Sequence, residues 1–286
     1  MDGAQLVASL GLLGFLVVIY QYMQRDDDAK KTYPVAISKK FPSFPLKEKK
    51  ALNHNTYFFR FGLPAGHVLG LPTGKHLKLK YTDEEGEDVQ RSYTPVSSND
   101  DVGYFDLIIK VYEKGLMTNH LKNMEIGDTI KAAGPIGKIE YKAGTVLQKV
   151  SGKVESQAVE HIGMICGGTG ITPMLQIVRE IQKNANDNTK VSLLFANVTE
   201  DDILCKEELE TLTKEMKNFQ VAYTLDRPTD SWTGYKGFVS AEMMEKSLPQ
   251  AGPTTALFFC GPPPMVKSLE KHAAGLDHLK EHVYKF

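Results

Sequence analysis

The chain has 286 residues, which is enough for two domains of ordinary size. Its composition is that of a globular protein and its formal net charge is −1 at pH 7, so neither indicates a nucleic-acid partner. The three cysteines are widely spaced and include no C-x-x-C pair, so we expect free thiols in a reducing compartment rather than a zinc or iron–sulfur site.

The N-terminal segment carries no charged residue from Gly3 to Gln24 and is rich in Leu, Val and Gly. The core of this segment, Leu6 to Tyr22, is at the short end of the lengths that cross a bilayer, and Tyr20 and Tyr22 at its far end suit a membrane interface. A cleaved signal peptide and a buried core helix are the alternatives, but Asp2 is acidic and no small-residue cleavage site follows. We therefore predict a single-pass membrane anchor at residues 1–24. Basic residues follow it and none precedes it, which places the rest of the chain in the cytosol.

Residues 25–42 are charged, contain two prolines and are predicted to be a linker. From residue 43 to residue 141 the pattern changes to short alternating segments separated by Gly and Pro turns, which predicts a small antiparallel β-barrel. The expected strands are residues 56–61, 76–81, 89–93, 105–112 and 129–133. Residues 142–160 are polar and are predicted to connect this domain to the next one.

From residue 161 to residue 286, apolar strand candidates alternate with helical patterns, which predicts a Rossmann-like α/β domain with a parallel sheet. The expected strands are residues 162–166, 191–196, 220–225 and 256–260, and the expected helices are residues 173–183, 206–217, 241–247 and 263–274. The predicted fold is therefore an N-terminal transmembrane helix, an antiparallel β-barrel and a parallel α/β domain.

An R-x-Y-T-x-x-S pattern lies at the end of one expected barrel strand. Arg91 supplies a planar charged fork for a phosphate, Tyr93 a flat face, and Thr94 and Ser97 short hydroxyl groups. Alternate side chains of an extended segment share a face, so these groups suit a ligand that is partly aromatic and partly pyrophosphate. An ordinary strand followed by a Thr-Pro turn is the alternative.

A glycine-rich loop, G-G-T-G-I-T-P-M at residues 167–174, lies between an apolar strand and a helical pattern. Glycines allow the backbone to approach phosphates, and a helix N-terminus favours their charge. The loop is not a G-x-G-x-x-G, because Pro173 replaces the third Gly, although Pro is a good first residue of a helix. A second apolar strand leads into C-G-P-P-P-M at residues 260–265.

In this order and spacing, the three motifs resemble the ferredoxin–NADP reductase superfamily. Further segments at residues 109–112, 127–129, 134–137, 194–197 and 223–227 are similar to the NADH-cytochrome b5 reductase family, and the resemblance covers residues 43–286. It implies an FAD-binding barrel, an NAD-binding α/β domain, bound FAD and NADH as substrate. It also implies hydride transfer from NADH to FAD and two single-electron transfers to cytochrome b5 or a similar one-electron carrier. An H-P-G-G haem motif is missing, so the chain does not look like a fusion with its own cytochrome.

For FAD, the resemblance implies that Arg91 grips the pyrophosphate and that Tyr93 and Thr94 line the isoalloxazine and ribityl chain, with Ser97 completing the motif. Lys110, near flavin and nicotinamide, and Tyr112 would share one strand face. A short phosphate loop is implied at Gly115, Met117 and Thr118, although the segment before it is shorter than in animal relatives.

The resemblance places Thr56 on the far side of the flavin. Without the resemblance, Thr56 and Lys110 are an ordinary strand threonine and a solvated lysine. The residues predicted to take part in the chemistry are Lys110, Thr56, Cys260 and Thr172. The reaction needs position rather than an acid–base pair, because the cofactor supplies the chemistry.

For NADH, the resemblance implies a pyrophosphate loop made of Gly168, Thr169, Gly170, Thr172 and Pro173, with Thr172 also reaching the isoalloxazine. Cys260, together with Gly261, would lie beside the nicotinamide, and Pro262 and Met265 would shape the adenine side. A buried thiol that packs as an apolar group is the alternative for Cys260.

Asp226 resembles the acidic residue near the adenosine ribose of this family. A carboxylate there accepts the 2′-hydroxyl and repels a 2′-phosphate, which favours NADH over NADPH. A turn or cap before Pro228 is the alternative. Phe286 matches the aromatic terminus of the family.

Two rival functions remain open. One is another reductase of the superfamily, such as the reductase module of a nitrate reductase or an NADPH-dependent enzyme, which Asp226 and the missing haem motif disfavour. The other is a non-enzymatic membrane tether that binds a nucleotide, which a flavin spectrum would test. By resemblance to fungal relatives, we expect the endoplasmic reticulum or mitochondrial outer membrane and electron supply to lipid desaturation, sterol synthesis and a diphthamide-synthesis electron carrier.

Overall fold

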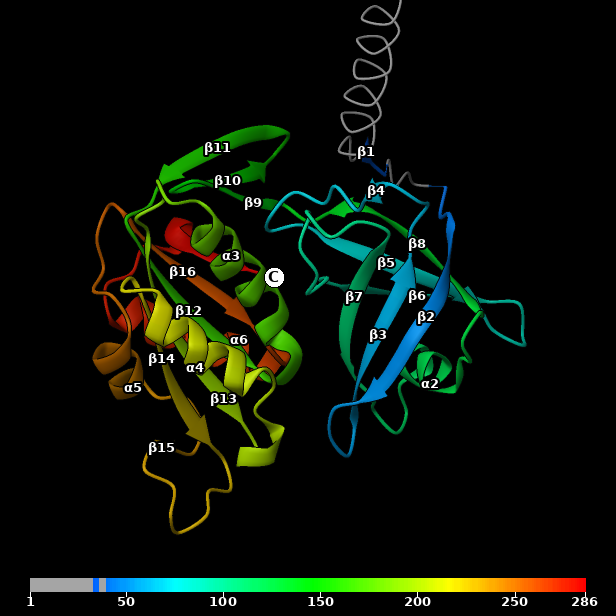
Figure 1. The fold of residues 1–286 in the computed structure, drawn as a ribbon. Helices are drawn as coiled ribbons and strands as arrows, with labels where there is room; N and C mark the ends of the chain where they lie inside the picture. The colour runs from blue at the N-terminus through cyan, green and yellow to red at the C-terminus, as the bar shows by residue number, and fades with distance from the viewer. Residues whose placement is uncertain (1–32, 36–39) are drawn as a thin grey trace, which may run out of the picture.

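The computed structural model describes residues 33–35 and 40–286. The predicted membrane anchor at residues 1–24 and most of the predicted linker lie outside these residues. Within the part of the chain that is described, no helix combines the length and the apolar character needed to cross a membrane. Two domains lie side by side, one built on antiparallel strands and the other on a parallel sheet (Figure 1).

The first domain is a six-stranded sheet in the order β6-β5-β8-β2-β3-β7, with antiparallel pairing throughout. Its strands are β2 (Ser43–Ala51), β3 (Thr56–Gly62), β5 (His76–Thr82), β6 (Asp88–Tyr93), β7 (Tyr104–Lys110) and β8 (Thr129–Ile136), and helix α2 covers Leu116–Asn123. Short β1 (Tyr33–Pro34) pairs with β4 (His67–Val68). Alternate residues of the strands, such as Leu77 and Leu79, point into an apolar core. The prediction of an antiparallel domain is confirmed.

The chain segment after β6 closes the gap between the two edge strands of this sheet. The Val96 N–H donates to the Asp106 carbonyl of β7 at 2.9 Å, and the Asp106 N–H donates to the Ser97 Oγ at 3.0 Å. The buried Asp106 carboxylate in turn accepts two bonds from Arg60 at 2.8 Å each. These contacts fix the end of β6, which carries the R-x-Y-T pattern, against β7.

The connection at residues 142–160 is folded as β-structure rather than as an irregular linker. Strands β9 (Ile139–Lys142), β10 (Thr145–Val150) and β11 (Lys153–Ala158) form a three-stranded antiparallel sheet. Most of β11 is exposed, so its sequence has little apolar alternation to reveal a strand. The Tyr141 hydroxyl donates to Asp187 at 2.6 Å, which ties this sheet to the second domain.

The second domain is a parallel six-stranded sheet in the order β15-β14-β13-β12-β16-β17. Its strands are β12 (His161–Gly167), β13 (Lys190–Asn197), β14 (Phe219–Leu225), β15 (Tyr235–Lys236), β16 (Thr255–Cys260) and β17 (Val283–Lys285). Its helices are α3 (Ile171–Lys183), α4 (Lys206–Glu215), α5 (Ala241–Ser247) and α6 (Pro263–Gly275), with 3₁₀ turns η1 (Gly168–Gly170), η2 (Glu200–Asp202) and η3 (Lys280–His282). This confirms the predicted α/β domain.

Helices cover both faces of the parallel sheet (Figure 1). On one face, α3 and α4 pack over residues such as Met164 and Phe195, and on the other, α5 and α6 pack over residues such as Ile165 and Phe259. The chain leaves β12 for β13 on one side and later returns to β16 on the other side. Open α/β sheets bind ligands at such a reversal of strand order, beyond the carboxyl ends of the strands.

Helix α3 joins the two domains. Its Gln176 side chain accepts the Gly74 N–H of the first domain at 2.8 Å and donates to the Lys75 carbonyl at 3.3 Å. Val96 and Ile108 of the first domain belong to the same apolar cluster as the buried residues of α3, such as Leu175. The first residues of α3 are therefore held against β7.

Candidate functional site

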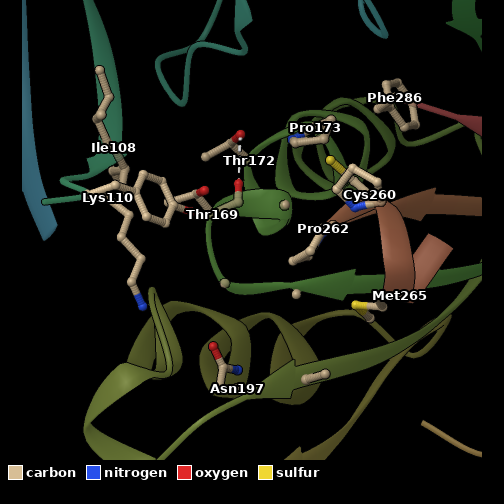
Figure 2. Close-up of a pocket in the computed structure, with 18 of the residues that line it drawn as sticks. Ile108, Lys110, Thr169, Thr172, Pro173, Asn197, Cys260, Pro262, Met265 and Phe286 are labelled. Atoms are coloured by element: carbon tan, nitrogen blue, oxygen red, sulfur yellow. Dashed lines mark hydrogen bonds between the residues drawn. The ribbon is translucent and has the colours of Figure 1, made fainter. Parts of the chain in front are cut away.

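A cleft of about 1210 Å³ lies between the domains. Strands β6 and β7 and the start of α2 form one wall, and the carboxyl ends of the parallel strands form the other. Figure 2 shows Lys110 of the first wall and Thr172 and Cys260 of the second. The predicted site residues that line it are Arg91, Tyr93, Thr94, Lys110, Tyr112, Gly115, Met117, Thr118, Gly168, Thr169, Gly170, Thr172, Pro173, Asp226, Cys260, Gly261, Pro262 and Met265. Motifs from distant parts of the sequence therefore meet in one space.

Two predicted residues are not among those that line the cleft. The Ser97 Oγ faces β7, where it accepts the Asp106 N–H. Thr56 is 1% exposed, and its hydroxyl donates to the Asn55 side chain at 3.1 Å. Thr56 does lie directly opposite Lys110, a cleft residue, in the register of β3 and β7.

The barrel wall presents Arg91 and Tyr93 from alternate positions of β6. Arg91 is exposed, and its Nη1 donates to the Gln90 carbonyl at 2.7 Å, which leaves other guanidinium N–H groups for a ligand. Burial raises the pKa of Tyr93, so its phenol stays protonated at neutral pH. The expectation that Tyr112 shares a strand with Lys110 is wrong, because β7 ends at Lys110; Tyr112 nevertheless reaches the cleft from the loop that follows, 57% exposed.

Helix α2 begins in the cleft after Gly115, where no side chain caps its first turn. The Thr118 hydroxyl donates to the Gly115 carbonyl at 3.1 Å and accepts the Tyr112 N–H at 3.3 Å, which braces the turn. Amide groups of an uncapped first turn are suited to an anion. The predicted phosphate loop is thus the N-terminus of a short helix.

The glycine loop forms a second uncapped helix start on the opposite wall. It leaves β12, makes the turn η1 and enters α3 without a capping side chain. A methyl group on Gly170 would collide with the Cys260 carbonyl, so only glycine lets the loop lie this close to β16. The Thr172 hydroxyl donates to the Thr169 carbonyl at 3.1 Å (Figure 2).

Two further predicted residues lie on this wall, at the carboxyl ends of two different strands. Cys260 ends β16, and burial raises the pKa of its thiol to about 11, so it is not a thiolate nucleophile at neutral pH. Asp226 follows β14 and is exposed to solvent; neighbouring residues nevertheless desolvate its carboxyl in part, which raises the pKa of that group, and the charge of Arg227 opposes the shift. In the described residues, 33–35 and 40–286, no three His, Cys, Asp or Glu side chains gather as metal ligands would.

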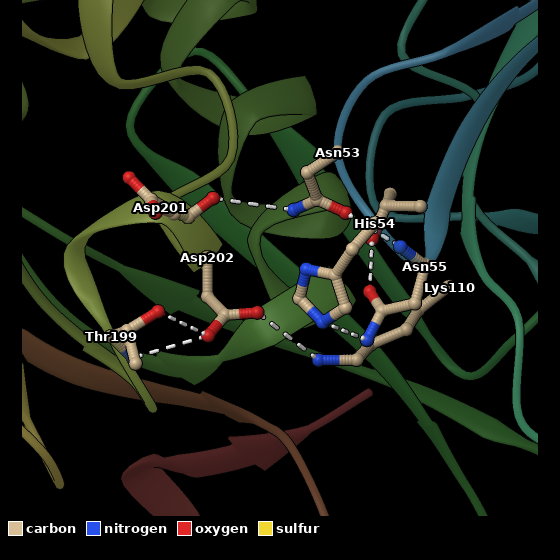
Figure 3. Close-up of polar contacts among 8 residues, drawn as sticks. Asn53, His54, Asn55, Lys110, Thr199, Asp201 and Asp202 are labelled. Atoms are coloured by element: carbon tan, nitrogen blue, oxygen red, sulfur yellow. Dashed lines mark hydrogen bonds and ion pairs between the residues drawn. The ribbon is translucent and has the colours of Figure 1, made fainter.

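Sequence reasoning missed an ion pair that crosses the cleft. The Lys110 Nζ of β7 lies 3.6 Å from Asp202 in η2 of the other domain (Figure 3). Asp202 is buried, which favours its neutral form, but the Thr199 hydroxyl at 2.7 Å and the Thr199 N–H at 3.1 Å donate to it, and its pKa falls below the ordinary value. The Asn53 side chain donates to the Asp201 carbonyl beside it at 3.3 Å.

Comparison with known proteins assigns these features to a family. A model of the oxidoreductase FAD-binding domain matches residues 43–141, and a model of the oxidoreductase NAD-binding domain matches residues 164–271. NADH-cytochrome b5 reductase 1 of Debaryomyces hansenii is 46% identical over 92% of this chain and 87% of its own length. NADH-cytochrome b5 reductase 2 of Mus musculus is 50% identical over 80% of this chain and 87% of its own length. The chain belongs to the NADH-cytochrome b5 reductase family.

Solved structures agree with this assignment. The cytochrome b5 reductase domain of Ulva prolifera nitrate reductase superimposes with a TM-score of 0.82 at 38% identity and covers 88% of this chain and all of that one. The CS-b5R domains of human Ncb5or give a TM-score of 0.73 at 26% identity over 86% of this chain and 69% of that one. The reductase is therefore an FAD-dependent oxidoreductase that uses NADH.

The residues of the reductase fit both cofactors. FAD and NADH each carry one diphosphate, and the cleft offers one uncapped helix start in each domain, at α2 and at α3. Two residues that were not among the predicted site residues also line the cleft. Asn197 is 6% exposed with both side-chain polar atoms unpartnered, and Phe238 is 84% exposed at the cleft. Asn197 does lie directly after an expected strand and at the end of the family-like segment 194–197, which were the available signals.

Proposed function

We propose that the protein transfers electrons from NADH through FAD to cytochrome b5 or a similar one-electron carrier. The observation that carries this proposal is the cleft between the domains, into which each domain contributes one uncapped helix start that suits a diphosphate. Such a cleft brings two dinucleotides together, and the names of the relatives supply cytochrome b5 as the acceptor. An exposed side of the cleft, where Tyr112 and Leu116 are each 57% exposed, suits contact with a protein acceptor.

The barrel residues would hold FAD. When bound, FAD can accept two electrons as a hydride and pass them on one at a time. Arg91 and the first turn of α2 would bind its diphosphate, and Tyr93 and Thr94 would lie along the ring and the ribityl chain. Lys110 is oriented by Asp202 at the point where the two domains meet, 3.6 Å from it.

The residues of the α/β domain would position NADH. The glycine loop and the first amides of α3 would bind the diphosphate, and Asp226 the adenosine ribose. Thr172, which is buried, and Cys260 would shape the place where the nicotinamide lies. Because the Cys260 thiol stays protonated, it packs there without reacting, and no acid–base pair takes part.

A spectrum and one assay test this function. The purified protein should be yellow with flavin absorption bands, and NADH should reduce cytochrome b5 with two molecules of cytochrome per NADH. A colourless protein that binds NADH would contradict the proposed reductase and favour the alternative, a non-enzymatic membrane tether that binds a nucleotide. Reduction of artificial acceptors without any reduction of cytochrome b5 would keep the reductase and remove the proposed acceptor.

We also propose that residues 1–24 anchor the protein to a membrane with the two domains in the cytosol. The uncharged N-terminal run and the basic residues after it support this topology. By resemblance to fungal relatives, the membrane is the endoplasmic reticulum or the mitochondrial outer membrane. The electrons would serve lipid desaturation, sterol synthesis and a diphthamide-synthesis electron carrier. Fractionation of cells that express a tagged protein tests the location.

A further inference from the structure

Asn197 is a buried side chain with unused hydrogen-bonding capacity in the cleft. It is 6% exposed, and neither its Nδ2 nor its Oδ1 has a hydrogen-bond partner. Asn197 lines the cleft, and in Figure 2 its carboxamide points from its strand toward the open space that Lys110, Thr169 and Met265 also border. Leaving a buried amide unpaired is unfavourable, and native proteins rarely tolerate it without a reason. A ligand that fills the cleft would supply that reason.

The neighbours of Asn197 locate the part of the ligand that it would meet. It is the last residue of β13, and the residue before it, Ala196, lies opposite Gly167 at the start of the glycine loop. On its other side, the Asp226 N–H donates to the Asn197 carbonyl at 3.0 Å. Asn197 therefore lies between the predicted diphosphate loop and the predicted ribose carboxylate. Lys110, across the cleft, has its charge engaged by Asp202.

The chemistry of the amide selects the ligand group. A carboxamide presents donors and an acceptor together. A phosphate oxygen accepts only and would leave the Oδ1 unpaired, and the face of a ring satisfies neither atom. The adenine edge and the nicotinamide carboxamide can pair with both atoms, but they are the two ends of the dinucleotide, whereas Asn197 lies between the predicted diphosphate loop and the predicted ribose carboxylate. A ribose hydroxyl both donates and accepts. We infer that Asn197 binds a ribose hydroxyl of the nicotinamide dinucleotide and so helps to fix the dinucleotide in the cleft. This inference rests on the proposed function, and in particular on NADH as the substrate.

The test compares Asn197→Leu with a matched control, Asn218→Leu. Asn218 is an asparagine of the same domain whose Nδ2 donates to the Thr189 carbonyl at 2.8 Å outside the cleft. For both variants and the wild type, flavin content, the dissociation constant for NAD⁺ and the Tm with and without NAD⁺ are measured. Loss of a ligand hydrogen bond should weaken NAD⁺ binding by about tenfold in Asn197→Leu.

Stability separates this role from a purely structural one. Without NAD⁺, Asn197→Leu should be at least as stable as the wild type, because it removes an unpaired amide, while its stabilisation by NAD⁺ should shrink. Asn218→Leu should lower the Tm and leave the NAD⁺ dissociation constant unchanged. Asn197→Asp, which keeps an acceptor for a ribose hydroxyl but lacks the donor, should bind NAD⁺ more tightly than Asn197→Leu does, with normal flavin content.

Two nucleotide fragments identify which ribose is bound. Equal weakening for ADP and NAD⁺ in Asn197→Leu identifies the adenosine ribose, whereas weakening for ADP-ribose and NAD⁺ but not ADP identifies the nicotinamide-side ribose. NAD⁺ affinity within twofold of the wild type in both Asn197 variants, or loss of flavin from them, overturns the inference. A wild type that binds no NAD⁺ would instead overturn the proposed function.

Discussion

At the scale of single residues, Arg91 lines the cleft, and we propose that its guanidinium binds the diphosphate of FAD. It is exposed and bonded to a neighbouring carbonyl, so it is available without breaking an ion pair. Arg91→Ala should therefore cost FAD binding about 1.5–3 kcal/mol, or roughly ten- to a hundredfold in affinity. Flavin absorbance after dialysis measures this loss. Arg179→Ala, which removes a pair with Glu208 outside the cleft, should retain its flavin.

Asp226 is the residue from which we predict the choice of nicotinamide nucleotide. The wild type should strongly prefer NADH in kcat/KM, because the phosphate of NADPH would approach a carboxylate. Asp226→Thr should raise the NADPH value and lower the NADH value, and added salt should reduce the effect because the residue is exposed. Steady-state kinetics with both nucleotides measures the ratio. An unchanged ratio would show that Asp226 is only a turn residue.

At the scale of elements, the pair between β7 and η2 joins the domains and depends on pH. The folded-state pKa of Asp202 is lowered from 3.8, so its stabilising contribution is complete above that value and is lost as the pH falls through the folded pKa. Asp202→Asn should lower the free energy of unfolding by about 1–3 kcal/mol at pH 7, since it leaves Lys110 without a counter-charge. The difference from the wild type should shrink in acid.

Denaturant unfolding of both proteins across a pH series measures this difference. The control is Asp201→Asn, in the same 3₁₀ turn, whose link across the cleft uses its backbone carbonyl rather than its side chain. It should behave as the wild type does. A difference between Asp202→Asn and the wild type that persists unchanged in acid would contradict an ionic role.

The elements that the sequence predicted well are those with a clear apolar period. Strands β12, β13 and β16 are largely buried apolar runs, β14 is a partly buried one, and each was predicted to within about two residues at each end. Strand β2 was missed because its first half contains Pro45 and its second half is mostly charged, which leaves no alternation. Helix α2 was missed because eight residues are too short for a period.

The site residues also divide into those that a local sequence pattern predicts and those that it does not. Arg91, the glycine loop and Cys260 were predicted because their motifs are contiguous and follow expected strands. Asp202 and Asn197 were missed because their roles depend on partners, or on the lack of partners, that only the folded chain defines. Lys110 and Asp202 are far apart in sequence, so no local pattern connects them. Ser97 was placed at the ligand, although its hydroxyl serves to close the barrel.

At the scale of the whole molecule, each domain has its own apolar core, and both lie within residues 40–286. Deletion of residues 1–24 should therefore leave a soluble, yellow protein with NADH-dependent reductase activity, while the full chain should sediment with membranes. Absorption spectra and activity of the supernatant after centrifugation measure this. A truncated protein that fails to fold or to retain FAD would show that the segment belongs to the core.

The hairpin of β10 and β11 has a consequence for engineering. Its two-residue turn, Ser151-Gly152, is exposed and has positive φ at both positions, and six residue pairs join the strands on either side of it. Exposed turn tips of this kind tolerate a break in the chain. A break there would put the flavin motif on one polypeptide and the nicotinamide motif on the other. If each half were fused to one of two proteins that bind each other, binding would reassemble the cleft. Electron transfer from NADH would then report directly that the two proteins are bound.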